Sequence, residues 1–112
     1  MTVARVAAAA LACAAWAAQA QQPAVPDAAQ IDLGRKVFTQ QASPACAVCH
    51  TLRDAQADGS IGPDLNELQP GSDQVRAVLR DGSGAMPSFE GQLTPEQLEA
   101  VIAYVVWASR AP

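Results

Sequence analysis

The residues of this chain best suited to hold a cofactor are Cys46, Cys49 and His50, which form a Cys-x-x-Cys-His run. This spacing is the one by which proteins attach a c-type haem. Two thiols three positions apart on one turn can each add across a vinyl group of the porphyrin, and the histidine that follows then lies beneath the iron. A neutral imidazole suits iron, and its second nitrogen can be oriented by a neighbouring carbonyl. The run therefore predicts one covalent haem with His50 as an axial ligand.

Three other interpretations of the run remain as alternatives. A zinc site needs about four ligands, and the only further candidates are carboxylates and the distant Cys13. A thioredoxin-like redox pair would lie between a strand and a helix of a βαβ unit, and no such strand-rich context surrounds the run. A structural disulfide between Cys46 and Cys49 would leave His50 without a role. Haem accounts for all three residues.

The first twenty residues have the layout of a secretory signal peptide. Arg5 precedes an apolar run from Val6 to Trp16, and Ala18-Gln19-Ala20 fits a small-x-small cleavage site. The apolar run is shorter than the roughly 20 residues of a membrane span, and nothing later resembles a stop-transfer segment. We therefore expect a secreted, periplasmic protein with no transmembrane segment in its mature form. A lipid anchor is the alternative, because Leu11-Ala12-Cys13 loosely resembles a lipoprotein processing site.

The 112-residue chain is then expected to consist of a signal peptide at 1–20, a mobile leader at 21–26 and one domain at 27–112. Processing leaves His50 as the only histidine and Met86 as the only methionine. A lone methionine is usually a filler of the core. A thioether is nevertheless a suitable iron ligand, and a loop can deliver it to the haem face opposite the histidine. Counting therefore selects Met86 as the second axial ligand, if that ligand is methionine or histidine.

Net charge limits the kinds of partner. Removal of the signal peptide removes one arginine, which leaves six basic residues against eleven acidic ones. An acidic protein of this kind is not expected to bind nucleic acid.

Local signals predict helices in three places. Asp27 can cap a first helix, with Gln30 in the capping-box position. Ser72 is a plausible N-cap for a second helix, which Gly82 would end. The last helix has the clearest signals, which are Thr94 as N-cap, Pro95 at N1 and Gln97 at N3.

No stretch shows the alternation of a strand, so the sequence predicts an all-α fold of several short helices wrapped around one haem. We expect residues 51–60 to form a short helix and a solvated loop. The last helix carries an apolar stripe that should face the first helix and the haem, although an exposed stripe used for oligomerisation is an alternative. Gly34 in the first helix indicates either a close helix crossing or a tolerated surface glycine.

Pro63 is the candidate partner of the histidine ring. Proline has a fixed φ and no N–H, so a Gly62-Pro63 segment is stiff and can hold its carbonyl at a set point. We expect that carbonyl to accept a hydrogen bond from the His50 ring. Taken alone, a Gly-Pro pair is only a turn signal.

From about Asp27 to its C-terminus the chain resembles the small monohaem class I c-type cytochromes. The attachment run, the Gly62-Pro63-Asp64-Leu65 segment and the Met86-Pro87 segment occur in the order found in that family. Gly34 and Phe38 are similar to its N-terminal crossing positions, and Tyr104 to their aromatic partner. The resemblance implies the class I cytochrome c fold, with one haem c bound through Cys46 and Cys49, near Pro63, and ligated by His50 and Met86.

Residues 51–68 and 84–87 also resemble the cytochrome subunit of bacterial sulfite dehydrogenases. This resemblance implies an electron carrier, not an enzyme, that accepts electrons from a periplasmic dehydrogenase and passes them to an oxidase or another cytochrome. A haem enzyme or gas-binding protein with an open sixth site is the alternative, as is a haem-free redox or metal module. Lys36 is the only lysine, so a lysine-ringed docking face is not implied.

Docking is expected at an apolar haem edge near Val48. The acidic surface should steer the partner, together with arginines where they flank this edge; the candidates are Arg35, Arg53, Arg76 and Arg80.

Overall fold

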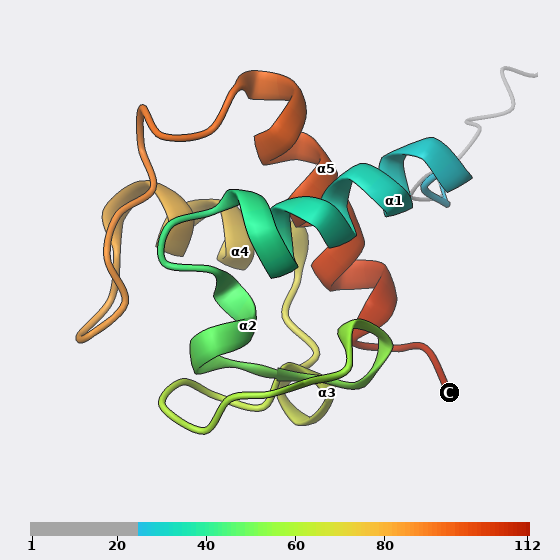
Figure 1. The fold of residues 1–112 in the computed structure, drawn as a ribbon, viewed down its shortest axis with the longest axis horizontal. Coiled ribbons are helices and arrows are strands. Elements are labelled where there is room, and N and C mark those ends of the chain that lie inside the picture. Colours follow the sequence, from blue (N-terminus) through green and yellow to red (C-terminus); the bar gives the residue numbers. More distant parts are fainter. Residues whose placement is uncertain (1–24) are drawn as a thin grey trace, which may run out of the picture.

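The computed structural model describes residues 25–112, so the expected signal peptide at 1–20 and most of the leader at 21–26 lie outside it. Short helices dominate the described chain, as predicted (Figure 1). The α-helices are α1 (Ala28–Lys36), α2 (Cys46–Cys49), α3 (Leu65–Leu68), α4 (Ser72–Asp81) and α5 (Pro95–Ala108). Within residues 25–112, no helix has the length and apolar character needed to cross a membrane.

The first helix begins where its cap was predicted. The Asp27 carboxylate accepts a hydrogen bond from the backbone N–H of Gln30 at 2.7 Å. After Lys36 the helix widens into a π-helical turn, Val37–Gln41, in which the N–H of Ala42 bonds to Val37 O at 3.0 Å. The chain then bends toward α2.

A glycine lets α1 cross α5 at close range (Figure 1). A Cβ built on Gly34 would lie 2.3 Å from both the carbonyl oxygen of Ala100 and the Cβ of Tyr104. Gly34 is therefore a crossing glycine and not a tolerated surface one. Next to this contact, the rings of Phe38 and Tyr104 meet edge to face with their centroids 6.0 Å apart.

The last helix has the complete capping box that its sequence predicts. Thr94 Oγ1 accepts the N–H of Gln97 at 3.1 Å, and Gln97 Oε1 accepts the N–H of Thr94 at 2.9 Å. The apolar stripe faces the core, as expected. The buried residues of α5 are Ala100, Val101, Ile102, Tyr104, Val105 and Ala108.

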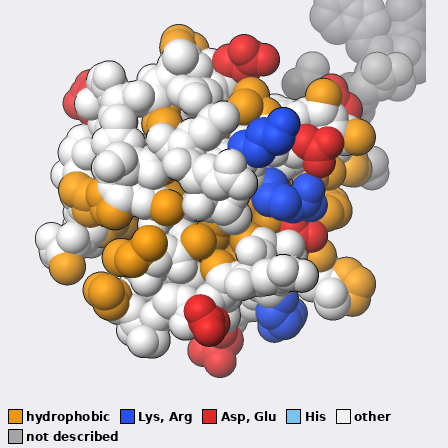
Figure 2. All heavy atoms as spheres, in the orientation of Figure 1, with side chains coloured by type: hydrophobic (Ala, Val, Ile, Leu, Met, Phe, Trp, Pro, Cys, Tyr) orange, Lys and Arg blue, Asp and Glu red, His pale blue; other side chains and the backbone are white. Residues whose placement is uncertain are grey.

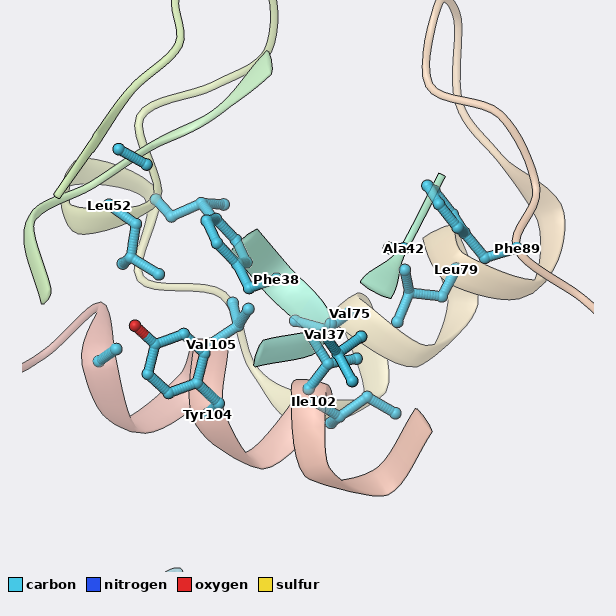
Figure 3. Packing of buried hydrophobic residues seen from close by; sticks show 14 residues of the cluster. Val37, Phe38, Ala42, Leu52, Val75, Leu79, Phe89, Ile102, Tyr104 and Val105 are labelled. Carbon is cyan, nitrogen blue, oxygen red and sulfur yellow. The ribbon is translucent and has the colours of Figure 1, made fainter. Parts of the chain in front are cut away.

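The core extends from the helix crossing toward α4. Figure 3 shows Phe38, Tyr104 and Val105 close together near the crossing, while Leu79 and Phe89 lie at the other end of the cluster. This arrangement leaves apolar side chains facing the space between α2, α4 and α5.

Two predictions about the middle of the chain need correction. Residues 51–60 contain the expected short helix as a 3-10 helix at Arg53–Ala55, but the chain on its two sides forms a small antiparallel pair, β1 (Thr51–Leu52) with β2 (Ala57–Asp58), and not a solvated loop. Strands of two residues are too short to show alternation, and Gln56, with φ of 52°, reverses the chain between them. The N-cap of α4 is Gly71, one residue before the predicted Ser72. The predicted stop at Gly82 is confirmed.

Candidate haem-binding site

A cleft of about 430 Å³ lies between α2, α4, α5 and the loop before α5. Its walls contain all five residues that the sequence analysis selected for the site, which are Cys46, Cys49, His50, Pro63 and Met86. Most of the remaining lining is apolar and includes Phe38, Leu65, Val75, Leu79, Val101 and Val105. A site of this kind suits a largely apolar cofactor with a few polar contacts.

Helix α2 presents the two thiols to the cleft. This single turn begins at Cys46 and ends at Cys49, and the N–H of His50 closes it by bonding to Cys46 O at 3.0 Å. Behind it, a Cβ on Gly59 would lie 2.6 Å from Val48 O, so only glycine lets this backbone approach the turn. Gly59 therefore packs against the backbone of this turn, while both cysteines line the cleft.

The thiol chemistry does not favour the haem-free alternatives. Burial raises the pKa of the Cys46 thiol to about 11. A thioredoxin-like nucleophile needs a lowered pKa, so this environment is the opposite of an activating one. The two cysteines and His50 also do not converge as zinc ligands would, since residues 25–112 contain no group of three or more His, Cys, Asp or Glu side chains that could hold a metal ion.

The His50 ring is held by the segment that the sequence analysis named. The carbonyl oxygen of Pro63 lies 2.8 Å from His50 Nδ1. A Cβ on Gly62 would lie 2.5 Å from His50 Cε1, so the ring rests against the glycine backbone. The N–H of Gly62 in turn bonds to Cys49 O at 2.7 Å. With Nδ1 engaged in this way, Nε2 is the nitrogen left for a metal.

Met86 reaches the cleft from the loop between α4 and α5. Backbone hydrogen bonds between Ser83 and Met86, at 2.9 and 3.0 Å, close a tight turn that was not predicted. At the base of this turn Gly82 has φ of 73°, and a Cβ there would lie 2.8 Å from Met86 O. The methionine side chain is half-buried and lines the cleft.

Sequence reasoning missed a polar network beside the site. Asp54 Oδ2 accepts hydrogen bonds from Tyr104 Oη at 2.6 Å and from Arg35 Nη2 at 3.0 Å. The guanidinium also lies over the Tyr104 ring, 5.4 Å from its centroid. Burial and the hydrogen bond to Asp54 raise the pKa of Tyr104 well above its ordinary value. No local pattern marks these contacts, because Asp54 lies 19 residues from Arg35 and 50 from Tyr104.

Three of the four arginines that were expected to help steer the partner form ion pairs. Arg35 pairs with Asp32 and Asp54, Arg76 with Glu99, and Arg80 with Asp81. In the part of the chain that the structure describes, Arg53 is the one of the four candidate arginines without an ion pair. Figure 2 shows basic and acidic side chains next to one another on the α1 side of the molecule, with hydrophobic side chains on both sides of the view. With eleven acidic residues against six basic ones, the described chain is acidic overall.

The residues of the cleft fit a covalently bound haem. They supply two thiols on one turn, an imidazole whose second nitrogen is oriented by a carbonyl, a thioether on a separate loop, and apolar walls.

Comparisons with known proteins agree with this chemistry. Residues 29–105 match the family model described as cytochrome c oxidase, cbb3-type, subunit III. Cytochrome c6 of Leptolyngbya boryana is 36% identical over 77 residues, a match that covers 65% of this chain and 86% of that protein. The crystal structure of the c-type cytochrome SorU from Sinorhizobium meliloti superposes with a TM-score of 0.70 and 42% identity, covering 74% of this chain and 94% of that one.

A larger protein contains a related segment. The quinohemoprotein alcohol dehydrogenase ADH-IIG of Pseudomonas putida is 30% identical over 83 residues, which are 71% of this chain but only 11% of that protein. The family model, the small relatives and the solved structure agree on one class of protein. The chain therefore belongs to the c-type cytochromes, which transfer electrons, in the family described as cytochrome c oxidase, cbb3-type, subunit III, and has the class I fold.

Proposed function

We propose that this chain binds one haem c through Cys46 and Cys49, with His50 and Met86 as the axial ligands of the iron. The observation that carries the proposal is that one apolar cleft is lined by both thiols, the imidazole and the thioether. When bound, the haem supplies a one-electron couple between ferric and ferrous iron.

The protein side chains determine what that couple can do. His50 is oriented by Pro63, which fixes the ring tautomer and leaves Nε2 for the iron. Met86 fills the position on the other face, which leaves no open site for oxygen or substrate. A thioether ligand and an apolar environment both favour the reduced state, so the potential should be high. The role is therefore electron transfer without substrate chemistry.

The haem also contributes to folding. Most of the side chains that line the cleft are apolar, and on the cleft side they have no protein atoms to pack against. A domain of fewer than about 100 residues also has a small core of its own. We expect the chain without haem to be poorly folded.

We infer that the donor is a periplasmic dehydrogenase and that the acceptor is an oxidase or another cytochrome. The resemblance of residues 51–68 and 84–87 to the cytochrome subunit of bacterial sulfite dehydrogenases favours a sulfite-oxidising donor. Val48, in the middle of the attachment turn, is 61% exposed and gives an apolar contact point next to the cleft. Contacts between redox proteins are small and short-lived, so a small apolar contact at Val48 suits this role.

Stopped-flow reduction tests the donor. The ferric protein is mixed with sulfite and a purified sulfite dehydrogenase, and the appearance of the ferrous spectrum is followed. We expect fast reduction that requires the dehydrogenase. If sulfite and the dehydrogenase do not reduce the protein while another periplasmic dehydrogenase does, the donor is wrong and the carrier role stands.

We propose in addition that residues 1–20 are removed on export to the periplasm, on the evidence of Arg5 and Ala18-Gln19-Ala20. Mass spectrometry of the secreted protein should give an N-terminus near Gln21 and the added mass of one haem. A chain beginning at a lipid-modified Cys13 would contradict this and make the protein membrane-anchored.

A further inference from the structure

The Met86 loop, residues 82–94 between α4 and α5, has few buried side chains. Phe89 is 5% exposed, and Met86 and Leu93 are half-buried. Gly84, Ala85 and Pro87 are exposed. Segments with few buried contacts open at a low free-energy cost. The position of this loop therefore depends on its hydrogen bonds.

The first half of the loop is fastened to the end of α4. Ser88 Oγ donates to Arg80 O at 2.6 Å, and the N–H of Phe89 donates to Leu79 O at 2.7 Å. These bonds explain how the residues directly after Met86 are held. They do not connect the loop to the part of the chain that carries the two cysteines.

The second half makes that connection through one side chain. Gln92 Oε1 accepts the N–H of Ser43 at 2.8 Å, and Gln92 Nε2 donates to Ser43 O at 2.8 Å. The side-chain amide of Gln92 thus bonds to both the N–H and the carbonyl oxygen of Ser43, which lies 49 positions earlier in the chain and three residues before Cys46. A turn aims Gln92 at Ser43, because its own N–H bonds to Phe89 O at 3.0 Å across Gly91, whose φ is 75°.

We propose that Gln92 is a positioning residue, a latch that ties the Met86 loop to the segment preceding the haem-attachment turn and so keeps Met86 on the iron. The proposal rests on the proposed ligation by Met86. The latch joins the Met86 loop to the segment just before Cys46, so the methionine and the cysteines keep a fixed relation. Two neutral hydrogen bonds at an exposed site change an opening equilibrium by roughly three- to tenfold.

Imidazole binding to the ferric protein measures how often Met86 leaves. Imidazole can bind only after the methionine has left, so its rate at saturating concentration reports loop opening. We expect Gln92→Ala to raise this rate roughly three- to tenfold. Amide hydrogen exchange in residues 83–93 should accelerate in parallel. Gln40→Ala is the matched control, because Gln40 is exposed and its side chain makes no hydrogen bond within residues 25–112, and it should leave both readouts unchanged.

A second variant separates a latch from general destabilisation. In Gln92→Glu, a protonated carboxyl group can still accept from the Ser43 N–H and donate to Ser43 O. The ionised form has no donor and places negative charge beside that carbonyl oxygen. The ratio of its amide exchange rate in residues 83–93 to that of Gln92→Ala should therefore be low near pH 4 and rise as the pH passes the carboxyl pKa, ordinarily about 4.3. Hydrogen exchange is the readout for this series, because free imidazole is protonated near pH 4 and cannot bind iron. A merely loosened fold would give a ratio independent of pH.

The outcomes distinguish the latch proposal from the proposed ligation of the iron by Met86, on which it rests. If Met86→Ala keeps the wild-type spectrum, the ligation is wrong and the latch proposal falls with it. If Met86→Ala changes the spectrum but Gln92→Ala matches Gln40→Ala in imidazole rate and hydrogen exchange, the ligation stands and the latch alone is wrong. A flat Gln92→Glu ratio between pH 4 and 8 would also contradict the latch.

Discussion

The carbonyl oxygen of Pro63 lies 2.8 Å from Nδ1 of His50, and the backbone of Gly62 presses against the same ring. The two contacts fix both the rotation and the tautomer of the imidazole. Since the ring is proposed to hold the iron through Nε2, its orientation should govern the strength of that bond.

Gly62→Ala tests this support directly. A Cβ at Gly62 would lie 2.5 Å from His50 Cε1, so the ring or the Pro63 loop must move. We expect a loss of about 1 to 3 kcal/mol of stability, typical of overpacking, together with a shifted ferric spectrum. Urea unfolding and visible spectroscopy measure the two effects. Gly71→Ala is the control for the spectrum, because a Cβ there meets nothing within 4 Å and its cost to the N-cap of α4 does not involve the His50 ring. An equal shift of the spectrum in the two variants would contradict the close contact.

Gly34→Ala should separate the crossing helices. Alanine gains about 1 kcal/mol in helix propensity, yet its Cβ would lie 2.3 Å from the Ala100 carbonyl oxygen, a backbone atom that cannot move alone. We expect a net loss of about 2 kcal/mol, measured by urea unfolding, with the spectrum of the haem little changed. A stabilised variant would show that the helices do not approach so closely in solution.

Tyr104 should make stability fall at alkaline pH. Burial, with the hydrogen bond to Asp54, raises the pKa of Tyr104, so the folded state holds the phenolic proton more tightly than the unfolded state. This contribution is complete below the unfolded pKa of about 10 and is lost as the pH rises above it toward the folded value. Tyr104→Phe should be less stable by about 1 to 2 kcal/mol at pH 7. Urea unfolding from pH 7 to 11 should show the difference in stability between the wild type and Tyr104→Phe becoming smaller above pH 10. A difference that stays constant would argue against the raised pKa of Tyr104.

Val48→Glu should slow reduction by the physiological donor. The side chain is 61% exposed on the attachment turn, so a charge there interferes with an apolar contact and adds to the acidic surface. The reduction potential should stay nearly unchanged. Val25→Glu is the matched control, since Val25 is 81% exposed and does not line the cleft. Stopped-flow rates that are the same in both variants would place the docking surface elsewhere.

Helix ends and the site residues could be predicted because their signals are local. Asp27 and Thr94 cap their helices through residues three positions away, and Cys46, Cys49 and His50 lie within one turn. Such patterns need no knowledge of the rest of the fold.

Contacts between distant segments could not be predicted in the same way. Asp54 accepts a hydrogen bond from Tyr104, which is 50 residues away in the sequence, and Gln92 bonds to Ser43, which is 49 residues away. No periodic pattern in the sequence indicates either contact. Ion pairing of the arginines depends likewise on the fold, so the pairs that Arg35, Arg76 and Arg80 form could not be predicted.

Carbon monoxide binding to the ferrous protein tests the central claim, that His50 and Met86 fill both axial positions. Carbon monoxide needs an open sixth site, so the wild type should keep its ferrous spectrum under the gas. Met86→Ala should bind carbon monoxide readily and have a lower reduction potential, because the thioether that favours ferrous iron is gone. Ready binding by the wild type, or a Met86→Ala variant with the wild-type spectrum, would contradict the account.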